Sequence, residues 1–452
     1  MTADLLEAVR RALGRAERAG AFAADAVLVE SDSVEVRVRG EEIDFVQQSR
    51  ERTLGIRSFV KGAKGLRSAI TSTSDLDCDA IDRLADETVA LARATAEDPH
   101  AGLPEERFAS DLPDLALLDP EDRDVSLEER IHEARRAERS ARALDPRITN
   151  SEGSEVASSF SRVAYGSSAG FLSEYESAAH SLSSAPIASQ DGTMQTDYWY
   201  TVAHRRSALE EPEEVGRRAA ERALARLGAR QVPTCEVPVI FDGVSARSLL
   251  GNLASCLSGY AIYRRSSFLA GRLGERVASE LLSVVDDGRL PGGLGSRPFD
   301  GEGLPTRRTV VMERGKLESY LLDSYSGRKL GLASTGSAAR SAGSAPLAAP
   351  TNLWIEPGTS SLEEMIAGTE RGLLVTGLFG FGFNAVTGDF SRGATGAWIE
   401  RGERIHPVEE ITIAGNLAEM LTAIDAVGSE LVWLGSVGAP ALRIARMTVA
   451  GE

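Results

Sequence analysis

The sequence has few cysteines and no long apolar run. Its 452 residues include three cysteines, Cys78, Cys235 and Cys256, which lie far apart and form no CxxC pair. This spacing argues against a disulfide framework and against a zinc ribbon. No window approaches the roughly 18 uncharged apolar residues that a membrane helix needs. The first twenty residues lack the apolar core and cleavage site of a secretory signal, so we expect a cytoplasmic protein without membrane contact.

The chain has fewer positive than negative charges, with 50 lysines and arginines against 67 aspartates and glutamates. Its formal net charge is −17, and no block of lysines and arginines interrupts this acidic balance. A surface of this sign repels a phosphate backbone unless a local basic patch overrides it. We therefore expect no direct binding to nucleic acid.

The composition is that of an ordinary globular protein. Hydrophobic residues make up 42% and charged residues 26% of a chain long enough for two or three domains. Helical and strand-like segments come in blocks, which favours an α+β fold with antiparallel sheets. We divide the chain into an N-terminal α+β domain (1–115), a central α+β domain (116–230) and a larger, Gly-rich, β-rich C-terminal domain (231–452).

Local patterns predict the individual elements. Helical spacing of apolar residues indicates helices over 5–19, 74–96, 126–144, 213–227 and 248–256. Short β-branched runs between 25 and 71 indicate a meander of four strands, and Ser-, Thr- and aromatic-rich segments indicate more strands between 155 and 205. The Pro- and Asp-rich stretch 97–124 is typical of a linker. MERGKLESYLL and WIERGERI each predict a hairpin.

One pair of residues resembles part of a metalloprotease motif. His132 and Glu133 lie on the predicted helix 126–144, where zincins place two histidines and a glutamate on one face. Arg136 occupies the position of the second histidine, and Glu138 alone does not complete the set. A solvated helical face is the better interpretation. The remaining histidines, His100, His180, His204 and His406, fall in separate segments and show no shared role.

Two serine motifs also have simpler explanations. The segment from Gly166 to Gly170 matches the GxSxG nucleophile elbow, but strand-like residues flank it on both sides, so we predict a hairpin turn. Ser58 with Lys61, and Ser326 with Lys329, match SxxK without its companion motifs, and we interpret both as chance matches.

Three nearby glycines resemble a phosphate-binding loop. Gly377, Gly380 and Gly382 lack the GxGxxG spacing, and no Lys-Ser or Lys-Thr follows them. We expect them to permit close packing of the backbone.

Longer strings in the last domain resemble the TldD/PmbA family, once named for a supposed modulation of DNA gyrase. They are GERVASELLSVVDDG (274–288), SRGATGAWIERGE (391–403) and PVEEITIAGNL (407–417). Weaker matches, EDPHAGLP, DPRITNSEG and RMTVAG, extend the resemblance over nearly the whole chain. The chain is identified as a member of this family, and the details favour its PmbA (TldE) branch.

The resemblance implies where a zinc site would lie. TldD-type subunits resemble zinc peptidases with an HExxxH motif just before the VASEL segment and a cysteine near the C-terminus as a further ligand. The corresponding positions here are Gly251 for the first histidine, Asn252 for the glutamate and Cys256 for the second histidine. Glycine has no ligating side chain, asparagine is no general base, and no cysteine follows Cys256. We expect no catalytic residue and no metal in this chain, and zinc in a TldD-type partner.

The family implies a function in proteolysis. We expect a non-catalytic subunit that pairs with a TldD-type catalytic chain, or forms a homodimer alone, and helps process or degrade unfolded peptides and small proteins. A second interpretation is an autonomous peptidase that uses Cys256 or a non-standard metal site. A third is a homodimeric binding protein that regulates a partner. Peptide backbone pairing with an exposed strand edge would suit weak sequence preference.

Overall fold

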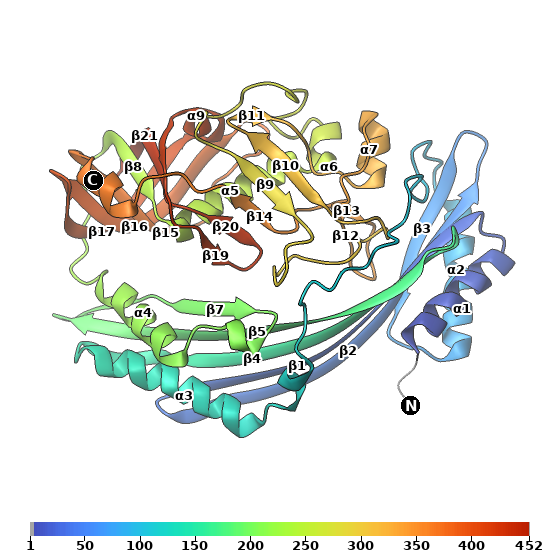
Figure 1. Cartoon of the computed structure of the whole chain (residues 1–452), viewed down its shortest axis with the longest axis horizontal. Coiled ribbons are helices and arrows are strands. Elements are labelled where there is room, and N and C mark those ends of the chain that lie inside the picture. Colours follow the sequence, from blue (N-terminus) through green and yellow to red (C-terminus); the bar gives the residue numbers. More distant parts are fainter. Residues whose placement is uncertain (1–3, 452) are drawn as a thin grey trace.

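The computed structural model of the chain describes residues 4–451. Its first half builds one antiparallel sheet of seven strands with the order β3-β2-β1-β4-β5-β6, and β7 also pairs with β5. The strands are β1 (Ala23–Arg39), β2 (Glu42–Lys61), β3 (Leu66–Thr73), β4 (Ile148–Ser167), β5 (Leu172–Gln190), β6 (Thr193–Thr196) and β7 (Trp199–Ala203). The long strands arch beneath the C-terminal part of the chain (Figure 1).

The strands β1, β2, β4 and β5 are each 17–20 residues long, whereas strands of 3–10 residues are usual. The prediction of four short strands between 25 and 71 was wrong at one place. The polar residues 31–33 separate two apolar runs, yet they pair with β2 on one side and β4 on the other. Their polarity reflects exposure in the middle of a single strand, β1, and does not mark a turn.

Two pairs of helices pack against this sheet. They are α1 (Leu5–Arg18) and α2 (Cys78–Ala94) at one end, and α3 (Leu127–Leu144) and α4 (Pro212–Leu224) at the other (Figure 1). The Ser126 side chain accepts a hydrogen bond from the Glu129 N–H (3.1 Å) and caps α3. Pro212 lies in the first turn of α4, where its missing N–H has no cost. These four predicted helices are confirmed.

The last domain contains two six-stranded sheets, with the orders β11-β10-β9-β14-β20-β19 and β17-β16-β15-β8-β21-β18. Most pairings are antiparallel, but β14 is parallel to β20 and β15 is parallel to β8. The predicted α+β class with a β-rich C-terminal domain is confirmed, as are both predicted hairpins. The strands are β8 (Cys235–Phe241), β9 (Val284–Asp287), β10 (Arg308–Glu313), β11 (Lys316–Leu317), β12 (Ala338–Ala339), β13 (Leu347–Ala348), β14 (Leu353–Ile355), β15 (Arg371–Phe379), β16 (Asp389–Glu400), β17 (Glu403–Asn416), β18 (Ile424–Val427), β19 (Val432–Leu434), β20 (Val437–Ala439) and β21 (Leu442–Ala450).

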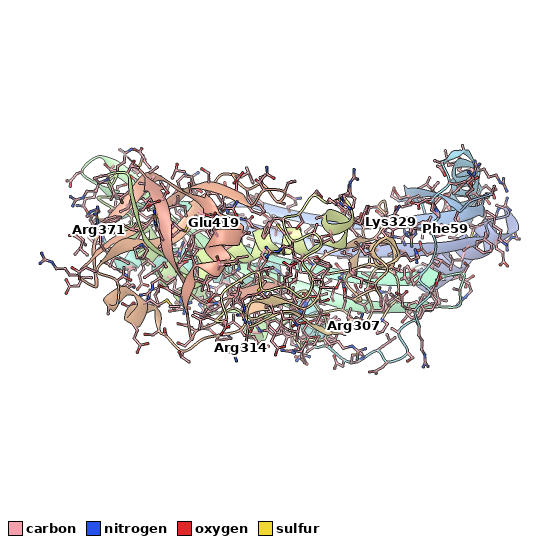
Figure 2. The ribbon with its side chains drawn as sticks, turned by 90° about the horizontal axis from the view of Figure 1, so that it is seen from above. Phe59, Arg307, Arg314, Lys329, Arg371 and Glu419 are labelled. Carbon is pink, nitrogen blue, oxygen red and sulfur yellow. The ribbon has the colours of Figure 1, made fainter. Side chains whose placement is uncertain are left out.

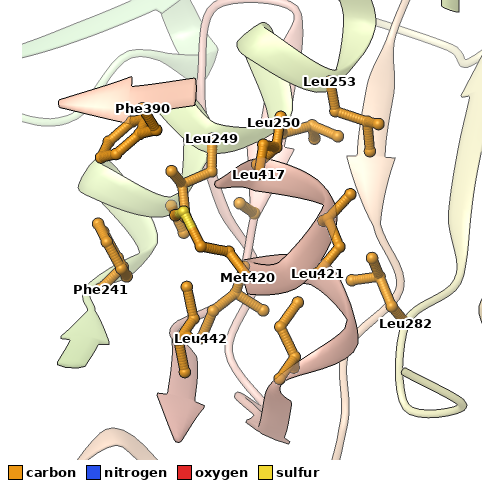
Figure 3. Packing of buried hydrophobic residues seen from close by; sticks show 14 of the residues in the cluster. Phe241, Leu249, Leu250, Leu253, Leu282, Phe390, Leu417, Met420, Leu421 and Leu442 are labelled. Atoms are coloured by element: carbon orange, nitrogen blue, oxygen red, sulfur yellow. The ribbon is translucent and has the colours of Figure 1, made fainter. Parts of the chain in front are cut away.

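One helix runs through the centre of this domain. It is α5 (Gly243–Leu257), which contacts strands of both sheets. Leu249, Leu250 and Leu253 on its buried face pack near Leu417 and Met420 (Figure 3). The shorter helices are α6 (Gly259–Tyr263), α7 (Ser324–Leu330), α8 (Leu362–Ala367) and α9 (Leu417–Thr422). Among the described residues, no helix is both long and apolar enough to cross a bilayer.

A buried cluster of charges, the interdomain ion cluster, joins the long sheet to the C-terminal domain. Asp25 of β1 pairs with Arg57 of β2 and, across the boundary, with Arg340 at 2.6 Å. Glu302 lies 3.7 Å from the Arg57 guanidinium and is fully buried. Burial acts to raise the pKa of Asp25, but Arg340 and Arg57 outweigh it and hold that pKa below its usual range. Asp25 is therefore an ionised carboxylate that pairs with an arginine of the long sheet and with an arginine of the C-terminal domain.

The backbones of the two parts also approach closely beside this cluster. A Cβ atom placed on Gly55 of β2 would lie 1.6 Å from the Ala342 carbonyl oxygen. Only glycine fits there without moving one backbone away from the other. The molecule is elongated, with Phe59 and Arg371 toward opposite ends (Figure 2).

We expect Asp25→Asn to lower the free energy of unfolding by about 3–5 kcal/mol, because it leaves Arg57 and Arg340 buried without their carboxylate. Urea unfolding of the variant and wild type measures the difference. Glu363→Gln is the matched control, because Glu363 pairs with Arg404 on the surface, where their side chains are 71% and 42% exposed. That change should cost less than about 1 kcal/mol. Equal effects of the two changes would contradict the role given to the cluster.

Candidate functional site

The three positions expected to match a zinc motif lie together on the second half of α5. The helix begins at Asp242, whose side chain accepts a hydrogen bond from the Ser245 N–H (2.7 Å). One face is buried in the core, whereas Gly251 and Ser255 on the opposite face are exposed. The predicted helix 248–256 is confirmed and starts five residues earlier.

Gly251 leaves an open space on this exposed face. A Cβ atom placed there meets no other atom within 4 Å. A large side chain would therefore fit, but glycine offers no donor atom to a metal.

Asn252 is half-buried beside Gly251. Its side-chain nitrogen is buried and has no hydrogen-bond partner among the described residues. A neutral amide neither ligates zinc as a carboxylate does nor takes a proton from water.

Cys256 is fully buried on the core side of α5. Its sulfur lies 4.0 Å from the Ala385 carbonyl oxygen. Burial raises the pKa of the Cys256 thiol to about 11, so it carries its proton at neutral pH. The thiolate is the form that binds metals and attacks carbonyl groups. These three positions thus provide no donor set that fits zinc, and residues 4–451 contain no other group of three His, Cys, Asp or Glu side chains placed to hold a metal.

The residues around His132 serve the packing of α3. His132 is exposed, as predicted, and Glu133 binds Arg206 at 2.5 Å. Arg136 pairs with Glu213 of α4 at 2.7 Å. The interpretation of a solvated face was wrong for Glu138, which is buried and accepts the backbone N–H groups of the β1–β2 turn. Sequence spacing gave no sign of that turn's approach to the helix.

Two of the scattered histidines come close together. His180 of β5 lies opposite Ala203, the residue before His204. The Nδ1 atom of His180 lies 2.9 Å from the Ser158 hydroxyl, and its Nε2 lies 3.4 Å from an oxygen of Asp122. The Nε2 atom of His204 lies 3.1 Å from the Gly293 carbonyl oxygen. The His204 ring therefore links the sheet to the loop at Gly293, whereas His180 bonds Ser158 within the sheet and its Nε2 has no hydrogen-bond partner among the described residues. His100 and His406 belong to the linker and to β17.

The remaining sequence motifs have structural roles. The segment from Gly166 to Gly170 includes the turn between β4 and β5, which confirms the predicted hairpin. Ser326 belongs to the capping box of α7, and the Lys61 ammonium lies 4.2 Å from the centre of the Phe22 ring. Gly382 permits close packing as predicted, because a Cβ atom there would lie 1.7 Å from the Ser391 carbonyl oxygen.

The burial of His180 makes stability depend on pH. Burial, assisted by Arg206 and Arg130, lowers the pKa of His180 to about 4. The pKa of a histidine in the unfolded chain is about 6.5. Between these two pKa values the unfolded chain binds a proton at His180 that the folded chain does not bind. The free energy of unfolding should therefore fall by up to about 3 kcal/mol as the pH drops from about 7 to about 4.

Urea unfolding at several pH values tests this expectation. We expect His180→Gln to flatten the loss of stability between pH 7 and 4.5. His132→Gln is the control, because that ring is exposed and should leave the slope unchanged. An unaltered slope in His180→Gln would show that His180 charges freely in the folded protein.

A cleft lies between the central segment and the C-terminal domain, and it includes the first half of α5. It has a volume of about 390 Å³. The residues that line it are Asp197, Tyr198, Trp199, Tyr200, Arg222, Arg226, Val244, Ser245, Arg247, Ser248, Thr376, Gly377, Leu378, Phe379, Thr395, Leu434 and Val437. A second hollow of about 480 Å³ shares Trp199, Arg222 and Val244 with it. We name the first of these the α5 cleft.

No pattern in the sequence predicts the α5 cleft as a whole. One signal was present, because Arg247 precedes Gly251 by four residues and therefore shares a helical face with it. The aromatic run from Tyr198 to Tyr200 was interpreted only as part of a strand. The pairing of these two segments depends on the tertiary fold.

Comparison with known proteins gives the family. Family models of the PmbA/TldA metallopeptidase match most of the chain. Domain 1 matches residues 24–92, the central domain matches residues 120–227 and the C-terminal domain matches residues 234–451. The chain is 38% identical to the metalloprotease PmbA of Escherichia coli O157:H7, over 95% of this chain and 92% of that protein. It is 36% identical to a PmbA homolog of Haemophilus influenzae, over 99% and 96% of the two chains.

Other matches include a further relative and two solved structures. A TldD homolog of Haemophilus influenzae is 30% identical over 52% of each chain. The crystal structure of a candidate modulator of DNA gyrase from Bacteroides thetaiotaomicron has a TM-score of 0.91 and 28% identity, with full coverage of both chains. TldE of Thermococcus kodakarensis shares the fold, with a TM-score of 0.86, 24% identity and coverage of 98% and 100%. The chain belongs to the PmbA/TldD metallopeptidase family.

Proposed function

We propose that this chain is the non-catalytic, PmbA/TldE-type subunit of a TldD/TldE metalloprotease complex that acts on unfolded peptides and small proteins. The observation that carries the proposal is the donor set on α5. Gly251 has no side chain, Asn252 is neutral, and Cys256 is a buried thiol whose pKa is raised to about 11. In this proposal, zinc and the groups that activate water belong to the TldD-type partner.

The relatives support a partnership of two related chains. Haemophilus influenzae has one relative named for PmbA and another named for TldD, and this chain matches the first over almost its whole length and the second over about half. A pair of related subunits, one with the catalytic residues and one without, fits this pattern. The contribution of this chain is then to bind and orient the substrate.

The fold offers an edge where an extended peptide could add. All pairings of β7 among the described residues are with β5, so its other edge has no strand partner. The residues at its start line the α5 cleft. Pairing through the backbone would hold a peptide without selecting its sequence.

The first test is the activity of the purified chain with and without its TldD-type partner. We expect the chain alone to bind no stoichiometric zinc and to cleave no unfolded peptide, whereas the mixture cleaves it. Metal analysis and mass spectrometry of the peptide products provide the measurement. The control is a mixture in which the partner's HExxxH glutamate is replaced by glutamine, which should be inactive. Cleavage by the chain alone would overturn the proposal.

A second test addresses Cys256. We expect Cys256→Ala to leave the activity of the mixture within about twofold of wild type, because a buried protonated thiol takes no part in the reaction. The free energy of unfolding should fall by about 1–2 kcal/mol through the small cavity created. Cys78→Ala is the control, because Cys78 is exposed. A large loss of activity in Cys256→Ala, with its fold intact, would favour an autonomous cysteine or metal site instead.

A further inference from the structure

The α5 cleft is positively charged although the protein is strongly acidic. Its lining contains three arginines, Arg222, Arg226 and Arg247, and one carboxylate, Asp197, and Glu409 lies 4.0 Å from Arg226 behind this lining, so the three arginines outnumber the two carboxylates. The whole chain has a net charge of −17. A cavity lined by one sign of charge attracts ligands of the opposite sign, so this contrast indicates an anionic ligand.

Two of the three arginines are engaged by the protein itself. Arg222 binds Asp197 (3.2 Å) and donates to the Thr376 carbonyl oxygen (3.2 Å), so it links α4 to β15 across the cleft. Arg226 donates to the Thr196 carbonyl oxygen at 2.8 Å and lies 4.0 Å from Glu409. Both guanidinium groups are therefore held in place as part of the cleft wall.

Arg247 is different because it has no carboxylate partner within 4 Å among residues 4–451. Its Nε donates to the Val437 carbonyl oxygen at 3.1 Å, which fixes the side chain, and its two terminal nitrogens make no hydrogen bond within the described protein. The side chain is half-buried and lines the cleft. A fixed guanidinium with two unused terminal nitrogens matches the two oxygens of a carboxylate.

The surroundings of Arg247 suit a peptide. The same cleft is lined by Tyr198 and Tyr200, whose rings stack with centroids 6.2 Å apart, and Tyr198 is 58% exposed. Aromatic rings of this kind provide contact area for side chains of many types. Trp199 is fixed by the guanidinium groups of Arg218 and Arg222, which lie 5.2 Å and 5.9 Å from the centre of its ring.

We propose that the α5 cleft binds a carboxylate group of an extended peptide, with Arg247 as the residue that recognises it. The carboxylate belongs either to the C-terminus of the peptide or to an aspartate or glutamate side chain. The inference rests on the proposed function for its substrate class. It assigns to the non-catalytic chain a binding site of its own, separate from the Gly251 region of the same helix.

The experiment is calorimetric titration of the full chain, without partner, with three decapeptides of otherwise identical sequence. One has a free C-terminal carboxylate as its only acid, the second is amidated, and the third is amidated with a single internal glutamate. We expect the amidated peptide to bind at least about tenfold more weakly than one or both of the others, since a bidentate charge-assisted contact is lost. The comparison of the first and third peptides identifies the source of the carboxylate.

Variants connect the effect to Arg247. We expect Arg247→Gln to remove the preference for the carboxylate. Arg247→Lys should retain part of this preference, because lysine keeps the positive charge but cannot form the bidentate contact. Arg314→Gln is the matched control, since Arg314 lies in the exposed turn after β10, with a side chain 74% exposed, and should not change binding (Figure 2). Equal unfolding midpoints of the variants would establish that each is folded.

The outcomes separate this inference from the proposed function. Binding that depends on the carboxylate and on Arg247 supports the inference, even if no partner-dependent cleavage is found. Equal binding of all three peptides, or a carboxylate preference that survives in Arg247→Gln, overturns it and leaves the cleavage experiment unaffected. Inorganic phosphate that binds at Arg247 while the peptides show no preference would also overturn it.

Discussion

The arrangement of the whole molecule depends on the burial of charge at Asp25. A carboxylate without exposure to water needs cations beside it, and the two that it has come from different parts of the chain. Arg57 belongs to the same sheet, but Arg340 belongs to the C-terminal domain. Separating the two parts would leave Arg340 without its carboxylate and Asp25 with only Arg57, so the ion cluster and the close approach at Gly55 together set how the domain sits on the sheet. The walls of the α5 cleft are brought together by this same arrangement, because one wall belongs to each part.

The helix α5 shows that the structural and chemical roles of one element can be separated. Its buried face contributes leucines to the central core, and its first turn is capped by Asp242. None of these contacts requires a ligating residue on the opposite face. A chain can therefore carry glycine or asparagine in place of a histidine or a glutamate at such positions and keep its fold. The open space beside Gly251 is consistent with a position where a larger side chain is compatible with the fold but absent.

The sequence predicted the five longer helices, α1 to α5, and the fold class, because these depend on local periodicity and caps, whereas the short helices α6 to α9 were not predicted. Ser126 and Pro212 mark the starts of two helices through contacts within a few residues. The sequence did not predict the continuity of β1, because polar residues on an exposed part of a long strand look like a turn. It also missed the buried state of Glu138 and the meeting of His180 with His204, which depend on segments distant in sequence. The division of the chain at residues 115 and 230 stays a prediction.

The zinc-motif positions could be located from the sequence, whereas the cleft could not. The family resemblance places these three positions just before the VASEL segment, on a single helix. The cleft combines β7, α4, α5 and β15, and no spacing rule connects them. Its charge shows the same limitation, because a net charge of −17 predicts repulsion of anions everywhere.

Electrostatic screening resolves this conflict between the whole chain and the cleft. At physiological ionic strength, the Debye length is about 8 Å, so most of the acidic surface is too far away to act on a ligand inside the cleft. Nearby groups are less screened, and there the three arginines outnumber the two carboxylates, Asp197 and Glu409. Arg222 pairs with Asp197 and Arg226 lies near Glu409, which leaves Arg247 as the lining arginine without a carboxylate partner among the described residues. The sign of the local charge, and not that of the whole protein, therefore determines which ligand the cleft can hold.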